Sequence, residues 1–106
     1  MHIRDFQDMM RQIYFYRDSK RGAAGMYSWL MEEIGELEAA MKEHDLKNME
    51  NEFADVLAWL ASLANVVNVD LEKATKTKYD NRCPKCGSSP CQCPFSNKAY
   101  PSEKNV

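Results

Sequence analysis

Five acidic side chains stand at helical spacings between Trp29 and Trp59. At roughly 100° per residue, positions three or four apart share one face of a helix. Two patterns, E-E-x-x-E and E-x-x-D, therefore each gather their carboxylates into a cluster. Carboxylate oxygens are the ligands that a hard divalent cation such as Mg²⁺ takes in proteins. The sequence thus predicts a divalent-metal site built from two helices, with five candidate residues: Glu32, Glu33, Glu36, Glu52 and Asp55.

The alternative is that these acids form solvated helix faces, as acid-rich faces usually do. Their apolar neighbours argue against it. Glu33 and Glu52 lie roughly 70° and 80° from the centres of the apolar stripes of their helices. A carboxylate at the edge of a core is unfavourable unless a cation compensates it, and like charges one turn apart repel. The stripes consist of Leu30, Ile34, Leu37 and Met41 on the first helix, and Phe53, Val56, Leu57, Leu60, Leu63, Ala64 and Val67 on the second.

Apolar periodicity predicts an all-α fold with four helices. The first spans residues 3–18, and the glycine-containing stretch 19–25 is expected to form a loop. The second spans residues 24–42 and the third 46–67, with Asp45 as its N-cap; Asp70 is the expected N-cap of the fourth. In the expected loop at 19–25, the side chains of Lys20 and Arg21 are either solvated or reach a ligand phosphate. His44, at a helix end, is read as a surface residue rather than a metal ligand.

The third helix is apolar or small on more than one face from Phe53 onward. Such a helix must be covered from more than one side, and one short chain supplies few partners. A second subunit is therefore expected to complete the bundle, as a homodimer or homotetramer. The contact is predicted on the small residues Ala54, Ala58 and Ala61, which allow another helix to approach closely.

The chain of 106 residues has room for one small domain. Its formal net charge of −2 argues against an electrostatic nucleic-acid binder. The longest apolar run is shorter than the roughly 18 residues of a membrane span, and the N-terminus lacks a signal-peptide core. We therefore expect a cytoplasmic protein with no membrane partner.

Four cysteines follow the helical region as C-x-x-C and C-x-C, at Cys83, Cys86, Cys91 and Cys93. Closely spaced thiolates with prolines and a glycine between them suit a tetrahedral, structural Zn²⁺ site. The alternative is a pair of disulfides, which a cytoplasmic chain disfavours. The predicted organisation is a helical domain at 1–82, a zinc-binding motif at 83–94 and a loose tail at 95–106.

Together, the two acidic patterns resemble those of the MazG-type all-α nucleoside triphosphate pyrophosphohydrolases, over about residues 20 to 82. Similarity to that family implies Mg²⁺ on Glu33, Glu36, Glu52 and Asp55, and cleavage of a nucleoside triphosphate between its α and β phosphates. It places Glu32 at the edge of the site, where it either orients the attacking water or holds a further ion. House-cleaning of the nucleotide pool is the implied role.

The resemblance also indicates residues for substrate binding. The family has a Lys and an Asn four residues apart near the end of its last helix; here Lys78 and Asn81 are three apart. Asn65 matches an asparagine often seen in the family, and Trp29, like Trp59, either stacks on a base or belongs to the core.

Other functions remain open from the sequence. Within the same superfamily these are a dUTP or dCTP pyrophosphatase and a phosphoribosyl-ATP pyrophosphatase. Outside it they are a non-catalytic helical interaction protein with a zinc staple and a zinc-dependent nucleic-acid binder. Neither of the last two needs acidic residues at the edge of a core.

Overall fold

The computed structural model describes residues 1–95 and is helical, with no strand in that range. Its helices are α1 (Ile3–Glu43), α2 (Leu46–Val66) and α3 (Leu71–Lys78). The chain divides into two compact units, Met1–Thr75 and the part from Lys76 onward. The predicted all-α class is confirmed. Most of the predicted tail, residues 96–106, lies outside the described residues.

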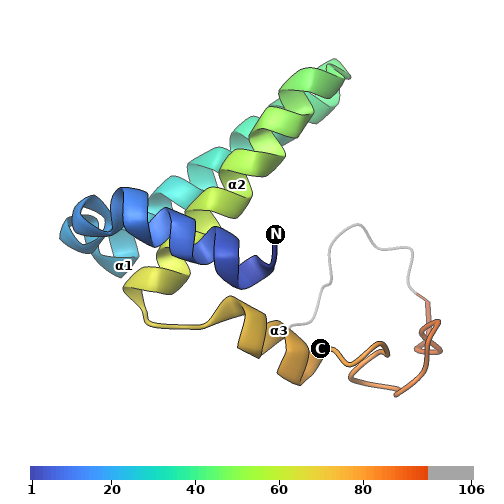
Figure 1. Cartoon of the computed structure of the whole chain (residues 1–106). Helices are drawn as coiled ribbons and strands as arrows, with labels where there is room; N and C mark the ends of the chain where they lie inside the picture. Colours follow the sequence, from blue (N-terminus) through green and yellow to red (C-terminus); the bar gives the residue numbers. More distant parts are fainter. Residues whose placement is uncertain (96–106) are drawn as a thin grey trace. The chain divides into compact units, whose positions relative to one another are not determined.

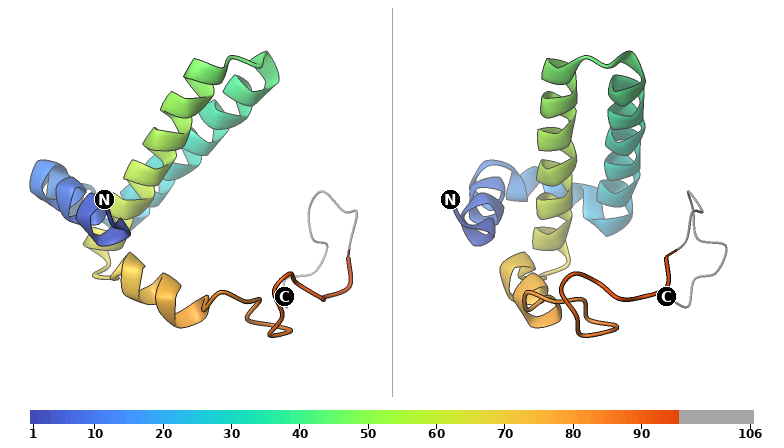
Figure 2. Two further views of the ribbon diagram at one scale, coloured as in Figure 1. Left: turned by 45° about the vertical axis from the view of Figure 1, so that its right-hand side comes forward. Right: turned by 90° about the vertical axis from the view of Figure 1, so that its right-hand side faces the viewer.

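Helix α1 contains both of the first two predicted helices. The expected loop at 19–25 is wrong, because helical geometry continues through Ser19, Lys20 and Arg21 and is interrupted only at Gly22, with φ 75° and ψ 169°. A positive φ of this kind is open to glycine because it lacks a Cβ. The break redirects the chain, and after it α1 runs beside α2 in the opposite direction (Figures 1 and 2).

Two aspartates start the later helices, as their positions in the sequence predict. The backbone N–H of Asn48 donates to Oδ1 of Asp45 at 3.2 Å, and that of Lys73 donates to Oδ1 of Asp70 at 3.1 Å. Each carboxylate thereby satisfies one backbone donor that a helix start leaves without a partner. His44 ends α1 with φ 57° and is exposed, in agreement with its reading as a surface residue.

The buried core of the first unit is small. Its buried apolar side chains come from both halves of α1 and from the C-terminal part of α2: Met10, Met26, Leu30, Ala40, Ala61 and Ala64. No single helix among the described residues is long and apolar enough to cross a membrane; α2 and α3 meet that test only together, with a bend of 99° between them.

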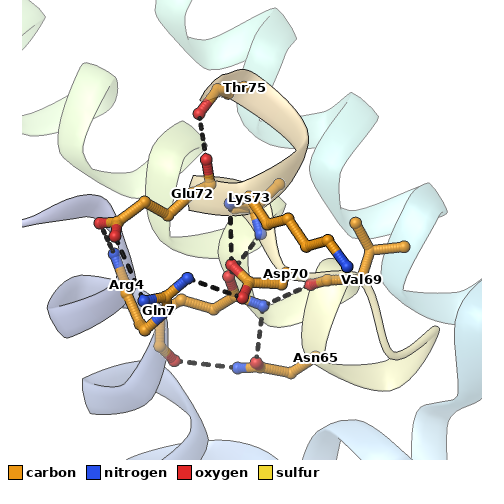
Figure 3. Close-up of polar contacts among 9 residues, drawn as sticks. Arg4, Gln7, Asn65, Val69, Asp70, Glu72, Lys73 and Thr75 are labelled. Carbon is orange, nitrogen blue, oxygen red and sulfur yellow. Dashed lines mark hydrogen bonds and ion pairs between the residues drawn. The ribbon is translucent and has the colours of Figure 1, made fainter. Parts of the chain in front are cut away.

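A buried polar network ties the start of α1 to the end of α2 and the start of α3 (Figure 3). The Nε2 of Gln7 donates to Oδ1 of Asn65 at 3.0 Å and to the carbonyl of Val69 at 2.7 Å, and its Oε1 accepts from the N–H of Leu71 at 3.0 Å. The Nδ2 of Asn65 donates back to the carbonyl of Gln7 at 3.1 Å. One side chain therefore holds three segments together.

We expect Gln7→Ala to lower the free energy of unfolding by about 1 to 3 kcal/mol, because it leaves buried donors and acceptors without partners. Chemical denaturation measures the change. Gln12→Ala is the matched control, since Gln12 is exposed on the same helix. Equal stability of the two variants would contradict a structural role of the network.

Candidate active site

The acidic cluster forms where α1 and α2 run side by side. Glu33 and Glu36 stand on consecutive turns of the second half of α1, and Glu52 stands on α2. One carboxylate oxygen from each of these three residues lies within 4.8 Å of the other two. The hairpin thus joins two patterns that are separate in the sequence into one group of ligands.

Charge repulsion and burial alter the ionisation of this cluster. The pKa of Glu33 is raised to about 7, first by desolvation, then by its hydrogen bond with Glu36 and by the charges of Glu36, Asp55 and Glu52. Desolvation and the charges of Glu36 and Asp55 also raise the pKa of Glu52. Asp55 therefore lies close enough to act on both carboxylates, although it is not in the three-residue ligand group.

The cluster fits a divalent cation. Oε2 of Glu33 and Oε2 of Glu52 are buried and have no hydrogen-bond partner among the described residues. Buried carboxylate oxygens without partners are unfavourable, and a hard cation with oxygen ligands supplies what they lack. Glu32 is exposed and its carboxylate is outside the ligand group, so its place at the edge of the site stays a prediction.

The raised pKa of Glu33 predicts a pH dependence of stability in the metal-free chain. The folded chain holds the Glu33 proton up to about pH 7, whereas the ordinary value is 4.5. The stabilisation that this proton contributes is complete below pH 4.5 and is lost as the pH rises through 7. In chelator, Glu33→Gln should therefore gain stability relative to the unmodified chain between pH 5 and 8. Thermal melts across that range test it, and a constant difference would contradict it.

A cavity of about 290 Å³ lies next to the cluster, between the first half of α1 and α2. Asp55 lines it, together with two arginines, Arg17 and Arg21. Arg21 is one of the two basic residues that the sequence predicts to be either solvated or in contact with a ligand phosphate, whereas Arg17 and Asp18 were not predicted as site residues. The spacing from Met10 carried a signal for both missed residues, because Arg17 and Asp18 follow Met10 by seven and eight residues and so lie on its side of the helix.

The two tryptophans pack on each other across the hairpin. The rings of Trp29 and Trp59 have centroids 5.6 Å apart and planes 14° apart, so they are stacked. Trp29 is exposed on its remaining surface, while Trp59 lines the cavity. Stacking of Trp29 on a substrate base stays a prediction.

The other predicted substrate-binding residues lie away from the ligand group or in the second unit. Asn65 is 4% exposed and bonded to Gln7, which gives it a role in packing. It stands ten residues, roughly 15 Å of helix, beyond Asp55. Lys78 and Asn81 belong to the second unit, where Lys78 Nζ lies 5.7 Å from the centroid of the Tyr79 ring. Phosphate binding by these residues stays a prediction.

The second unit contains the cysteine cluster. The four Sγ atoms lie within 4.8 Å of one another, and all four residues are free thiols: Cys83, Cys86, Cys91 and Cys93. The structure therefore contains four free thiols and not the alternative pair of disulfides. Cys83 Sγ and Cys93 Sγ are 3.8 Å apart, and Cys86 Sγ and Cys91 Sγ are 3.9 Å apart.

Backbone donors surround the thiols. The N–H of Gln92 donates to Cys86 Sγ at 3.2 Å, and that of Cys93 donates to Cys91 Sγ at 3.3 Å. Donors on Gln92 and Ser88 lower the pKa of Cys86 to about 6. The turn itself closes at Gly87, with φ 74°, whose N–H donates to the carbonyl of Cys83 at 2.7 Å. Thiolates gathered and hydrogen-bonded in this way are suited to a metal ion.

No curated protein matches the chain. The family model of the MazG nucleotide pyrophosphohydrolase domain matches residues 21–87, which is more than half of the chain and includes every residue of the acidic cluster. The chain therefore belongs to the MazG nucleotide pyrophosphohydrolase domain family.

Proposed function

We propose that this protein is a Mg²⁺-dependent nucleoside triphosphate pyrophosphohydrolase. It cuts the substrate between the α and β phosphates and releases the monophosphate and pyrophosphate, as a house-cleaning enzyme of the nucleotide pool. The observation that carries the proposal is the convergence of Glu33, Glu36 and Glu52, two of which have a buried carboxylate oxygen without a partner. A helical interaction module has no need of such a cluster at the edge of its core.

Glu33, Glu36 and Glu52 would hold Mg²⁺, with Asp55 beside them. When bound, Mg²⁺ neutralises phosphate oxygens and lowers the pKa of a coordinated water. The oxygen of the attacking water would bond to the α phosphorus. The anhydride bond between the α and β phosphates would break, and pyrophosphate would leave with the bonding electrons. Glu32, exposed at the edge of the site, orients that water and accepts its proton.

Positive charge is needed as well, because four carboxylates repel a triphosphate. Arg17 and Arg21 line the cavity that Asp55 shares, so they stand beside the acidic cluster. In water-accessible positions such as these, guanidinium groups attract anions and form paired hydrogen bonds with phosphate. We assign them to drawing the substrate towards the cluster.

The test is pyrophosphate release from a panel of triphosphates, with and without Mg²⁺. The panel includes dUTP, dCTP and phosphoribosyl-ATP, which separates the proposal from its relatives in the superfamily. Pyrophosphate formed only with Mg²⁺ is the expected result. Orthophosphate and a nucleoside diphosphate as first products would overturn it.

We also propose a structural Zn²⁺ ion on Cys83, Cys86, Cys91 and Cys93. Four thiolates form a closed tetrahedral shell for Zn²⁺, which contributes free energy of folding to the segment that it joins. The reducing cytoplasm, which we propose as the location, keeps such thiols available.

Zinc removal should affect the second unit and spare the acidic cluster. We expect elemental analysis to give one zinc per chain, and Cys86→Ser to lose most of it. Helical content measured by circular dichroism should change little, because the long helices lie in Met1–Thr75. A purified chain without zinc, in which four thiols react freely, would contradict the site.

The protein is further proposed to be a homodimer. A stripe of large apolar residues is exposed along one face of α2 and at its C-cap, at spacings that repeat on the helix: Leu46, Phe53, Leu57, Leu60 and Val67. Of the small residues predicted to form the contact, Ala61 is 1% exposed within the chain and Ala58 lines the cavity against α1, which favours a different face of α2 for the second copy. The second copy is therefore assigned to the large apolar stripe.

A further inference from the structure

The cavity beside the acidic cluster contains a carboxylate that the proposed reaction does not use. Asp18 lines the cavity and is 2% exposed. Its Oδ1 lies 3.4 Å from an Arg21 guanidinium nitrogen. Its Oδ2 is buried and has no hydrogen-bond partner among the residues that the structure describes. Leaving a buried acceptor unpaired is unfavourable, so a hydrogen-bond donor from a bound ligand would stabilise this carboxylate.

An aromatic wall stands in the same cavity. Trp59 lines it and is held in place by stacking on Trp29. The Arg21 guanidinium lies over the Trp59 ring, 5.4 Å from its centroid, so the same arginine orients both the wall and Asp18. The volume of about 290 Å³ is near the lower end of the range for small-molecule sites. A small group with N–H donors fits beside Asp18 in this cavity.

Phosphate is the poorer occupant of the cavity. Arg17 and Arg21 attract anions, but the carboxylates of Asp18 and Asp55 line the same cavity and repel them. The phosphates have a better place at the metal cluster. With the triphosphate held there, the end of a nucleotide that is left for the cavity is its base.

We propose that this cavity binds the nucleobase of the substrate and that Asp18 selects the base by accepting its hydrogen bonds. The inference rests on the proposed function, which places the triphosphate at the acidic cluster. An ionised carboxylate only accepts hydrogen bonds. Guanine is the standard base with two adjacent N–H donors on its pairing edge, at N1 and the 2-amino group. Uracil and thymine flank one donor with two carbonyls, and adenine and cytosine place a ring acceptor beside their amine. Guanine nucleotides are therefore the preferred substrates.

The first test changes the substrate and leaves the protein intact. Inosine triphosphate differs from guanosine triphosphate only in lacking the 2-amino group. We expect kcat/KM for pyrophosphate release to be about ten- to a hundredfold higher with GTP, because the pocket is built to pair that donor. Equal values for GTP, ITP and UTP would overturn the inference while leaving the proposed function intact.

The second test changes Asp18. Asp18→Asn keeps the shape, but the amide turns a donor into the cavity when its oxygen stays with Arg21. We expect the preference for GTP over UTP to be lost, with kcat/KM falling about ten- to a hundredfold for GTP and little for UTP. Asp8→Asn, an exposed aspartate on the same half of α1 that lies outside this cavity, is the charge-matched control. An equal fall for all bases would overturn base selection by Asp18.

A binding measurement separates failure of the inference from failure of the proposed function. Guanosine, which has no phosphate, should quench the tryptophan fluorescence of the metal-free chain, because Trp59 lines the cavity; uridine should do so weakly. If no triphosphate yields pyrophosphate, the proposed function fails and this titration decides the cavity alone. Quenching by guanosine that Asp18→Asn abolishes supports the site, and absence of guanosine binding overturns it.

Discussion

Glu36→Gln is expected to abolish Mg²⁺-dependent pyrophosphate release, with kcat/KM falling by about 100-fold or more. Glutamine keeps the size and one oxygen of the side chain but removes the charge that a hard cation requires of its ligands. Removing a partner of a metal ligand already lowers metal affinity by about 10- to 100-fold, and loss of a ligand should do at least as much.

The same substitution should leave the fold intact and stabilise the metal-free chain. The charge of Glu36 raises the pKa values of Glu33 and Glu52, so its removal relieves repulsion in the cluster. If Glu36 is a metal ligand, its substitution lowers activity and raises the stability of the metal-free chain. Substitution of a purely structural residue would lower both.

Glu38→Gln is the matched control, because it makes the same change two residues away on the same helix. Glu38 is strongly exposed, pairs with Lys42 at 3.9 Å and lies outside the ligand group. Exposed pairs of this kind contribute little to stability. Kinetics with varied Mg²⁺ and thermal melts in chelator check both variants, and normal activity of Glu36→Gln would remove the cluster from the mechanism.

Leu57→Glu is expected to separate the dimer and to lower stability by more than about 2 kcal/mol. In the single chain Leu57 is 49% exposed, and substitutions at such positions usually change stability by no more than about 0.5 kcal/mol. If a second copy covers the stripe, the substitution instead buries a charge without a partner, which is strongly unfavourable. The size of the effect therefore reports whether the face is covered.

Sedimentation and denaturation at several protein concentrations measure this effect. A dimer that is linked to folding gains stability with concentration, and the variant should lose that dependence. Asn51→Glu, which adds the same charge at an exposed position of α2 outside the stripe, should sediment as the unmodified chain does. A folded and active monomer of the unmodified chain at micromolar concentration would contradict the proposal.

The sequence by itself determined the local features of this protein. The two acidic patterns, the N-caps Asp45 and Asp70 and the all-α class follow from interactions between residues three or four apart. Such interactions depend on helix geometry alone, so the spacing of residues in the sequence is enough to predict them. The close spacing of the four cysteines likewise predicted their cluster, since a short segment keeps the thiols near one another.

Only the tertiary structure decided what covers each helix face. Periodicity placed Ala58 and Ala61 on a face of small residues. It did not show that the first half of α1 lies against this face, because the segment is redirected by a single dihedral change at Gly22. Asp18 was not singled out in the sequence, yet it is 2% exposed at a cavity that residues of α2 also line. Asn65 likewise forms a hydrogen bond with Gln7, which is 58 positions away in the sequence. Contacts between distant segments depend on how helices cross, which local periodicity does not fix.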